Sequence, residues 1–282
     1  MTERSGPGRL VLVATPIGNL ADLPPRAIEA MSTAALVCCE DTRRTGRLLQ
    51  HAGVRAQRLA VANDHTELAR INDVLDVLAA GGDVAVVTDA GTPGVSDPGE
   101  RLVRAALDAG FDVTAVPGPA AAVMAVTISG LPTSRFVFEG FLPRSGRERT
   151  DRLEEIAVEE RTVVLYEAPH RVRRTVADLT ASCGGDRRVA LARELTKRFE
   201  EVWRGTLADA QRHVGEQEPR GEYVVVVDGA SPPGPADDDA ILTALRMALQ
   251  GGADRRTAVA TVMAATGAAK RRVYDLALTL PR

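Results

Sequence analysis

Two stretches of the chain place acids, bases and arginines directly after short apolar runs. The first is Glu40-Asp41-Thr42-Arg43-Arg44, and the second is Tyr166-Glu167-Ala168-Pro169-His170-Arg171. Carboxylate and imidazole groups can take up a proton, and a planar guanidinium can bind a phosphate through two parallel hydrogen bonds. The structural alternatives are a helix cap at Asp41 or Thr42 beside solvated arginines, and an exposed helix that begins at His170-Arg171. Because acidic, basic and arginine groups occur together, both patterns favour a functional role.

Three further loops, 15–20, 89–99 and 117–122, are rich in glycine, proline and small residues and also follow apolar runs. Such loops let a ligand approach the backbone closely, because side chains there are small or absent. In open α/β sheets, ligands bind beyond the carboxyl ends of the strands. Ordinary tight turns would have a similar composition, but three such loops together favour a binding site.

Several kinds of site are disfavoured because their residues are missing. The loop after the first apolar run has one glycine, Gly18, and no lysine, so it is neither a G-x-G-x-x-G fingerprint nor a P-loop. No Ser/His/Asp arrangement is visible. The four histidines are scattered and no cysteine spacing suits zinc. We therefore expect no nicotinamide cofactor, no nucleoside triphosphate and no metal.

The loops need elements that position them, and the first half of the chain alternates short apolar runs with helical patterns. Continuous apolar runs are typical of strands buried on both faces, and their alternation with helices predicts a mostly parallel sheet. The predicted strands are 10–14, 35–39, 84–88 and 113–116. The predicted helices are 24–31, 42–51, 66–80, 99–109 and 120–129.

The second half predicts another α/β domain with a larger antiparallel component. Its predicted strands are 136–139, 162–166, 188–193, 200–205 and 223–228, with helices at 147–158 and 170–181. The stretch 231–235 has a linker composition, and the last segment predicts two or three short helices without a strand. The expected fold is therefore two α/β domains, 9–118 and 119–230, followed by a helical segment, 239–282.

The charge balance argues against a generic nucleic-acid binder at first sight. The 282 residues carry 35 Lys and Arg against 38 Asp and Glu, a net charge of -3. Only Lys197 and Lys270 are lysines, which indicates either a coding bias or phosphate recognition by arginine. Residues 241–282 carry +5, and the remaining 240 residues carry -8. This basic segment is either an RNA contact or a solvated helical face or dimer contact.

The cellular setting is indicated by what the sequence lacks. The three cysteines form no disulfide framework, and the adjacent Cys38 and Cys39 lie in an apolar run, as expected for buried thiols in a reducing cytosol. The first residues lack the apolar core of a signal peptide. No apolar run approaches the roughly 20 residues that a membrane span needs. We expect a cytoplasmic protein.

Five motifs in order resemble the ribosomal RNA small subunit methyltransferase I family, a branch of the tetrapyrrole methylase superfamily. They are Ala14–Leu20 (ATPIGNL), Cys39–Arg43 (CEDTR), Thr88–Gly99 (TDAGTPGVSDPG), Val116–Pro119 (VPGP) and Tyr166–Arg171 (YEAPHR). The resemblance covers residues 10–230 strongly and the C-terminal segment more weakly. Other branches carry a glycine-richer first loop, so Thr15-Pro16-Ile17-Gly18-Asn19 favours the ribosomal branch.

The resemblance implies S-adenosylmethionine in a cleft between the two α/β domains, and a homodimer. It implies 2′-O-ribose methylation of a cytidine in the decoding region of 16S rRNA, with a helix-turn-helix-like segment at 239–282 that binds RNA. The superfamily's glycine-aspartate-proline loop corresponds to Gly91-Thr92-Pro93, where Thr92 replaces the aspartate. The cofactor contacts implied by the resemblance are Pro16, Asp89, Gly91, Thr92, Pro93, Val95, Ser96, Ala120, Ala121, Glu167, Gly221 and Glu222.

Methyl transfer to a ribose hydroxyl is mainly a positioning task, and a general base would help because a neutral hydroxyl is a poor nucleophile. Candidate bases at strand ends are Asp41, Asp89, Glu167 and His170, of which we favour Glu167 or His170. The expected contacts to RNA phosphates are Arg43, Arg44, Arg171, Arg255, Arg256, Lys270, Arg271 and Arg272.

Two other functions stay open at this stage. A small-molecule methyltransferase of the tetrapyrrole type would need a largely closed apolar cleft, but the few phenylalanines near a plausible cleft do not favour a large flat ligand. A non-catalytic RNA-binding assembly factor could have kept the fold. Measured binding of S-adenosylmethionine would separate this factor from both enzymes.

Overall fold

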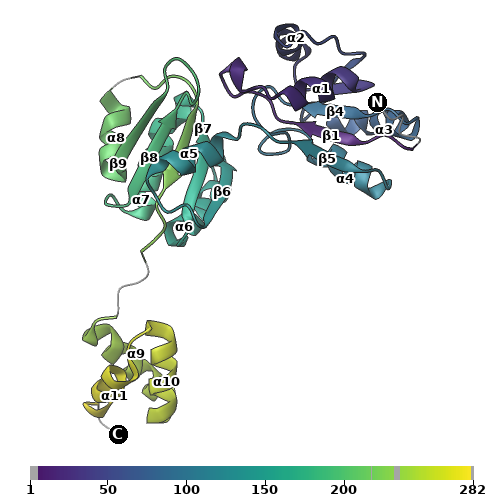
Figure 1. Ribbon diagram of the computed structural model, residues 1–282. Helices are drawn as coiled ribbons and strands as arrows, with labels where there is room; N and C mark the ends of the chain where they lie inside the picture. The colour runs from purple at the N-terminus through teal and green to yellow at the C-terminus, as the bar shows by residue number, and fades with distance from the viewer. Residues whose placement is uncertain (1–5, 217, 232–235, 281–282) are drawn as a thin grey trace. The chain divides into compact units, whose positions relative to one another are not determined.

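The structure is a computed structural model that describes residues 6–216, 218–231 and 236–280. The chain divides into two compact units, Met1–Ala230 and Ser231–Arg282 (Figure 1). Most of the predicted linker, 232–235, and the start of the predicted N-terminal tail, 1–5, lie outside the described residues. The division of the first unit into domains at 118 and 119 stays a prediction.

The first five strands form an entirely parallel sheet in the order β3-β2-β4-β1-β5. All residues of β2 and β4 are buried, which is why the sequence shows continuous apolar runs there. The sequence analysis missed β3, a three-residue edge strand with one exposed leucine. The strands are β1 Leu10–Val13, β2 Leu36–Cys39, β3 Leu59–Val61, β4 Val84–Val87 and β5 Val113–Val116.

The helices around this sheet follow the predicted order. Proline begins α1, where its missing N–H costs nothing, and the side chain of Asp41 caps α2. Burial raises the pKa of the Cys38 thiol to about 12, and Cys38 and Cys39 are both buried, as expected. The helices are η1 Leu20–Asp22, α1 Pro25–Thr33, α2 Thr42–His51, α3 Glu67–Ala79 and α4 Glu100–Asp108.

The second sheet has the order β6-β7-β10-β8-β9, with one parallel pair, β6 with β7, and antiparallel pairs elsewhere. The larger antiparallel component is thus confirmed. The strands are β6 Phe136–Phe141, β7 Thr162–Glu167, β8 Arg188–Arg193, β9 Glu201–Thr206 and β10 Tyr223–Val227. The accompanying helices are α5 Ala121–Ser129, α6 Arg147–Val158, α7 Pro169–Cys183 and α8 Leu207–Glu216.

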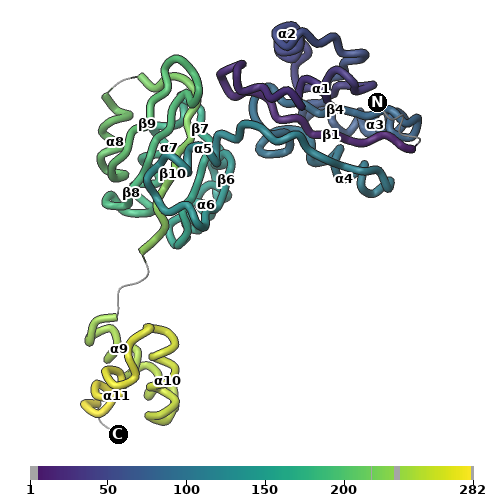
Figure 2. The backbone as a smooth tube through the Cα atoms, in the orientation of Figure 1, coloured from purple at the N-terminus to yellow at the C-terminus, as the bar shows by residue number. Residues whose placement is uncertain are grey.

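Strand β10 shows why this sheet holds together. Its side chains alternate between two cores, so Val224 and Val226 join the core that contains α5 residues, while Val225 and Val227 join the core built with α6, α7 and α8. Helices therefore cover both faces (Figure 2). The sequence analysis missed α8, whose buried side chains are Leu207, Ala210 and Val214.

The C-terminal unit consists of α9 Asp238–Gln250, α10 Arg255–Thr266 and α11 Lys270–Leu278. The side chains of Asp237 and Asp254 cap α9 and α10, and Gly267, with φ +64°, ends α10 in the left-handed conformation. A small separate core includes Ile241, Val262 and Val273. The predicted helical segment and the overall fold class are confirmed. No helix in the described part of the chain is long and apolar enough to cross a membrane.

Candidate functional site: a cleft at the strand ends

A cleft of about 520 Å³ lies where strand ends of both sheets contribute residues. The first sheet supplies the ends of β2 and β4, with Glu40 and the 89–99 loop. In the second sheet, β10 is antiparallel to both β7 and β8, so the ends of those two strands and the start of β10 share one edge. The volume of the cleft lies within the range of about 300–1,000 Å³ that is usual for small-ligand sites.

The three predicted loops are tied together. Thr15 and Gly91 exchange backbone hydrogen bonds of 2.8 and 3.1 Å, so the 15–20 loop pairs with the 89–99 loop. Thr92 Oγ1 donates to the carbonyl of Pro119 at 3.1 Å. The Thr92 hydroxyl therefore joins the 89–99 loop to the 117–122 loop.

The cleft brings together many, but not all, of the predicted site residues. Those that line it are Arg44, Asp89, Gly91, Thr92, Val95, Ser96, Ala120, Ala121, Glu167, His170 and Glu222. Those that do not line it are Pro16, Asp41, Arg43, Pro93, Arg171 and Gly221. Pro16 lines a smaller neighbouring hollow that shares Arg44 and Asp89 with the cleft.

Glu167 is fully buried and its carboxylate is engaged by three groups. Thr175 Oγ1 donates to Glu167 Oε2 at 2.6 Å, and the Ala168 N–H donates to Oε1 at 2.9 Å. Arg171 Nε lies 3.1 Å from Oε1 and its guanidinium also donates to the Leu142 carbonyl. A buried carboxylate held in this way orients the start of α7. It is poorly placed to take a proton from a substrate, and Arg171 is poorly placed to take a phosphate.

The network continues to Arg149, which is 4% exposed. Its guanidinium donates to Thr175 Oγ1 at 3.1 Å, to the Pro143 carbonyl at 2.8 Å and to Asp178 Oδ2 at 2.8 Å. Arg149 and Glu167 therefore meet at the Thr175 hydroxyl. This arrangement anchors the segment after β6 against α7.

Asp41 and Arg43 pair with each other outside the cleft. The Arg43 N–H donates to Asp41 Oδ1 at 2.8 Å, and the Arg43 guanidinium lies 2.9 Å from Oδ2. These hydrogen bonds hold the pKa of Asp41 at about 2, so it is a weak base. The helix-capping alternative for Asp41 is the one observed.

Carboxylates gather on one side of the cleft. Glu40 Oε1 accepts a hydrogen bond from the Asp89 N–H at 2.9 Å, and Arg44 lies 3.1 Å from Asp89 Oδ2. The other oxygen, Asp89 Oδ1, is buried and has no hydrogen-bond partner among the described residues. Burial raises the pKa of both Glu40 and Asp89. This side of the cleft suits a positively charged ligand or a hydroxyl donor.

Several residues that line the cleft are not among the predicted site residues. Asp97 is in the predicted 89–99 loop but was not singled out, and Lys197 bridges Glu194 at 2.8 Å and Glu222 at 2.6 Å. An apolar part of the lining consists of Ile17, Phe141, Tyr166 and Leu195. One available signal was the rarity of lysine, since Lys197 is one of only two in the chain.

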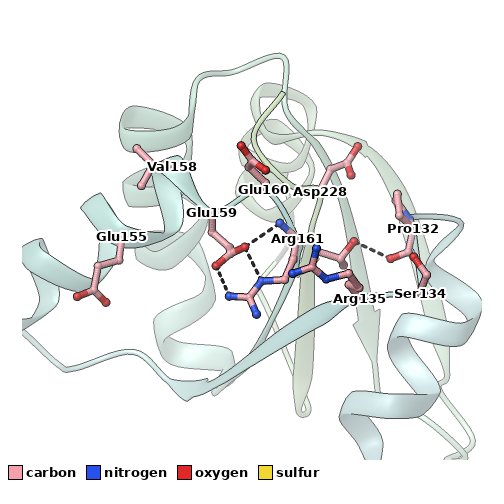
Figure 3. A pocket seen from close by; sticks show the side chains of 10 residues that line it. Pro132, Ser134, Arg135, Glu155, Val158, Glu159, Glu160, Arg161 and Asp228 are labelled. Carbon is pink, nitrogen blue, oxygen red and sulfur yellow. Dashed lines mark hydrogen bonds and ion pairs between the residues drawn. The ribbon is translucent and has the colours of Figure 1, made fainter. Parts of the chain in front are cut away.

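A second cavity, of about 560 Å³, lies at the opposite edge of the second sheet, where β7 begins and β10 ends (Figure 3). Within its lining, Arg161 Nη2 lies 2.6 Å from Glu159 Oε2. None of the predicted site residues lines it. No group of three or more metal-ligating side chains occurs within the described residues.

The cations predicted in the C-terminal unit divide into two sets. Arg255 donates to the Leu280 carbonyl at 2.9 Å, and Arg272 pairs with Asp238 at 2.7 Å. Arg256, Lys270 and Arg271 are exposed, and Tyr274 is exposed on the same helix as the last two. From Ser231, where the unit begins, the sequence has seven cationic and five carboxylate side chains, so the net charge of the unit is +2. The higher value of +5 omitted the aspartates at the start of α9.

Comparison with known proteins defines the class first. The family described as "Tetrapyrrole (Corrin/Porphyrin) Methylases" matches residues 9–211, and the chain belongs to this family. In solved structures, the methyltransferase CobJ matches with a TM-score of 0.61 at 22% identity, covering 80% of this chain and 95% of that chain. A uroporphyrin-III-C-methyltransferase from Thermus thermophilus matches with a TM-score of 0.54, also at 22% identity, covering 79% and 93%. Both support the fold alone.

Curated relatives are more specific. A protein from Synechocystis sp. named "Ribosomal RNA small subunit methyltransferase I" is 44% identical over 97% of this chain and 98% of its own length. Its namesake from Escherichia coli O157:H7 is 41% identical over 96% of this chain and 95% of its own length. The resemblance inferred from the motifs is therefore confirmed. The chain is a methyltransferase with S-adenosylmethionine as its methyl donor.

The residues of the cleft fit this donor. A sulfonium and an ammonium group are cations. The cleft offers a buried oxygen of Asp89, beside Glu40, to which none of the described residues donates a hydrogen bond. An adenine ring suits the apolar part of the lining, which includes Phe141 and Tyr166. Gly91, with φ +89°, has the left-handed conformation that favours glycine and leaves backbone open to a close approach.

Proposed function

We propose that this protein methylates the RNA of the small ribosomal subunit, at the 2′-hydroxyl of a cytidine in the decoding region of 16S rRNA. The observation that carries the proposal is the 41–48% identity to small-subunit ribosomal RNA methyltransferases, which for the first of them spans 97% of this chain. The cleft at the strand ends supplies a site of suitable size and charge for the donor.

Bound S-adenosylmethionine supplies an activated methyl group, so the protein's task is alignment and exclusion of water. The loops at 15–20, 89–99 and 117–122 hold the donor, with Asp89 directed to a cation or hydroxyl. Glu167 acts as a positioning residue through Thr175 and Arg171, rather than as the base. His170 is exposed at the cleft, and we assign it to contact with the RNA.

Contacts to RNA phosphates come from exposed cations. In the first unit these are Arg44 at the cleft and Arg43 beside it. In the C-terminal unit, Arg256, Lys270 and Arg271 are the exposed members of the predicted set. We assign Arg255 and Arg272 to holding the helical unit together, because their guanidinium groups are bonded within it.

Two properties of the working enzyme belong to the same proposal. Helix α5 exposes 53% of Val123 and 38% of Ile128, which supports association of this surface in a homodimer. Light scattering on the purified protein tests the homodimer, since a monomer mass would contradict it.

A substrate within the ribosome implies a cytoplasmic location.

The proposed function is tested by incubating the protein with S-adenosylmethionine and small ribosomal subunits that lack the modification, and then mapping ribose methylation by nuclease protection. We expect one new 2′-O-methylcytidine in the decoding region. Methylation of a tetrapyrrole instead of RNA would overturn the proposal. Binding of S-adenosylmethionine without any methyl transfer would also overturn it and would indicate an assembly factor.

A further inference from the structure

The tip of the 89–99 loop projects three consecutive side chains into the cleft. The Gly94 N–H donates to the Pro98 carbonyl at 3.1 Å, which closes the tip, and Val95, Ser96 and Asp97 all line the cleft. Ser96 has φ +61° and is one of three non-glycine residues in the described chain with positive φ. Such a conformation is unfavourable for a residue with a side chain and persists only where the surroundings enforce it. The structure therefore holds Asp97 at a defined place.

Two contacts from distant parts of the chain enforce this conformation. The buried Glu67 carboxylate accepts the N–H groups of Gly99, Arg101 and Leu102 through Oε1, at 3.0, 3.1 and 3.2 Å. On the other side, Gly140 comes so close that a Cβ there would lie 2.9 Å from Ser96 Oγ. Glu67 comes from the start of α3, which packs on the first sheet, and Gly140 comes from a bulge in β6 of the second sheet. Residues associated with both sheets therefore hold the loop.

Asp97 differs from its charged neighbours because its carboxylate has no hydrogen-bond or ion-pair partner among the described residues. The elements around the cleft present Glu40 after β2, Arg44 on α2, Asp89 after β4, Tyr166 on β7, His170 on α7, Glu194 and Lys197 after β8, and Glu222 before β10. Asp89 is paired with Arg44, and Lys197 is paired with Glu194 and Glu222.

These surroundings keep the proton on Asp97 up to neutral pH. Burial and the nearby charges of Glu40, Asp89, Asp64 and Glu222 raise the pKa of Asp97 to about 7. A base works best when its pKa is close to the working pH, because it is then both ionised and able to hold the proton. Asp41, with its pKa near 2, holds a proton too weakly, and the Glu167 carboxylate is already engaged by Thr175, Ala168 and Arg171.

We propose that Asp97 is the general base that removes the proton from the ribose hydroxyl. The assignment rests on the proposed function. The bond that forms joins the hydroxyl oxygen to the methyl carbon. The bond that breaks joins this carbon to the sulfonium sulfur, which keeps the electron pair and becomes a neutral thioether. The proton passes to the Asp97 carboxylate, and no further reactant is needed.

The test compares the full-length wild type with Asp97→Asn, which preserves shape and removes the charge, and with Asp76→Asn. Asp76 is an exposed aspartate on α3 outside the cleft and serves as the matched control. Calorimetry measures the affinity for S-adenosylmethionine. Single-turnover methylation of small ribosomal subunits is followed from pH 5 to 9. Carbon-13 NMR of labelled aspartate carboxyls follows the titration of the free protein, with Asp97→Asn identifying the signal.

We expect Asp97→Asn to keep cofactor affinity within about threefold and to lower the methylation rate about 10²–10⁴-fold. The wild-type rate should rise with pH and level off above an apparent pKa at or below about 7, since a nearby positive charge favours the carboxylate. One aspartate carboxyl of the free protein should titrate near neutrality, and Asp76→Asn should behave as wild type.

Each other outcome overturns the assignment in a distinguishable way. Unchanged turnover in Asp97→Asn, with an active wild type, excludes Asp97 as the base and leaves the proposed function standing. Loss of cofactor affinity assigns Asp97 to donor binding. If the Asp97 carboxyl titrates near pH 4, it is not a base with a pKa close to neutral pH. An inactive wild type with intact cofactor binding refutes the proposed function and, with it, the role of Asp97.

Discussion

At the scale of single residues, carboxylate side chains have quite different roles around this cleft. Glu167 is buried with three partners, Asp41 caps a helix, and Asp97 has no hydrogen-bond or ion-pair partner in the part of the chain that the structure describes. All three are carboxylates at the end of a strand or in the segment that follows one. Hydrogen bonds from Arg43 lower the pKa of Asp41, whereas burial and neighbouring carboxylates raise the pKa of Asp97.

Asp97 should make stability depend on pH. Its pKa is raised from 3.8 to about 7 in the folded chain, so between these values the folded state binds more protons than the unfolded state. Stability should therefore fall as pH rises through this window. We expect Asp97→Asn to stabilise the protein by about 1–3 kcal/mol at pH 8 and to have little effect at pH 4. Urea unfolding at the two pH values measures this, and an equal effect at both would contradict it.

Glu167 gives a contrasting prediction. Replacing it with glutamine leaves the Arg171 guanidinium without its buried charge partner, which should destabilise the protein by about 3–5 kcal/mol. Glu160→Gln, at an exposed position without a side-chain hydrogen bond among the described contacts, is the control and should change stability little. Thermal unfolding compares the two. Equal melting temperatures would show that the Glu167 network does not anchor α7.

At the scale of elements, the cleft depends on how helices and loops are capped by residues far away in sequence. Helix α4 follows the 89–99 loop and has no cap from its own N-terminal residue, Gly99. Glu67, from the start of α3, accepts its first N–H groups instead. One carboxylate thus joins two helices and stabilises the loop that carries Asp97.

Removing this cap should loosen the loop. Glu67→Ala leaves three N–H groups without their acceptor, and we expect a loss of about 2–4 kcal/mol, with Glu67→Gln intermediate because an amide oxygen can still accept. Hydrogen exchange should accelerate at residues 99–102 before it changes elsewhere in the unit. Protection that stays uniform in Glu67→Ala would contradict a local role.

At the scale of the whole molecule, the charge is unevenly distributed. The C-terminal unit carries +2, so the preceding 230 residues carry -5. The asymmetry is smaller than the values +5 and -8 suggested, because three aspartates begin α9 and one of them neutralises Arg272. The exposed positions of Arg256, Lys270 and Arg271, rather than a large net charge, support RNA binding.

We therefore expect the triple variant Arg256→Gln/Lys270→Gln/Arg271→Gln to bind small-subunit RNA more weakly, with the log–log slope of affinity against salt reduced by about 2–3. Cofactor affinity should not change. The matched control removes three exposed arginines of the first unit, Arg26, Arg104 and Arg147. Fluorescence anisotropy over a salt series measures the slopes. Equal slopes in both variants would remove the C-terminal unit from the RNA interface.

Much of the architecture follows from the sequence by itself. Strands buried on both faces appear as continuous apolar runs, so β1, β2, β4 and β5 could be located within a residue or two, and the ordered motifs identified the family. Edge strand β3 was not predicted because it is short and half exposed, and helix α8 was not predicted because its apolar positions are few.

The roles of side chains in the cleft were decided only by the tertiary structure. Whether Glu167 is free depends on Thr175 and Arg171, and whether Asp97 is held depends on Glu67 and Gly140. Local sequence determines secondary structure because hydrophobic periodicity is a property of neighbouring residues. The basicity of a carboxylate depends on charges and donors brought within a few ångströms by folding, and these come from distant parts of the chain.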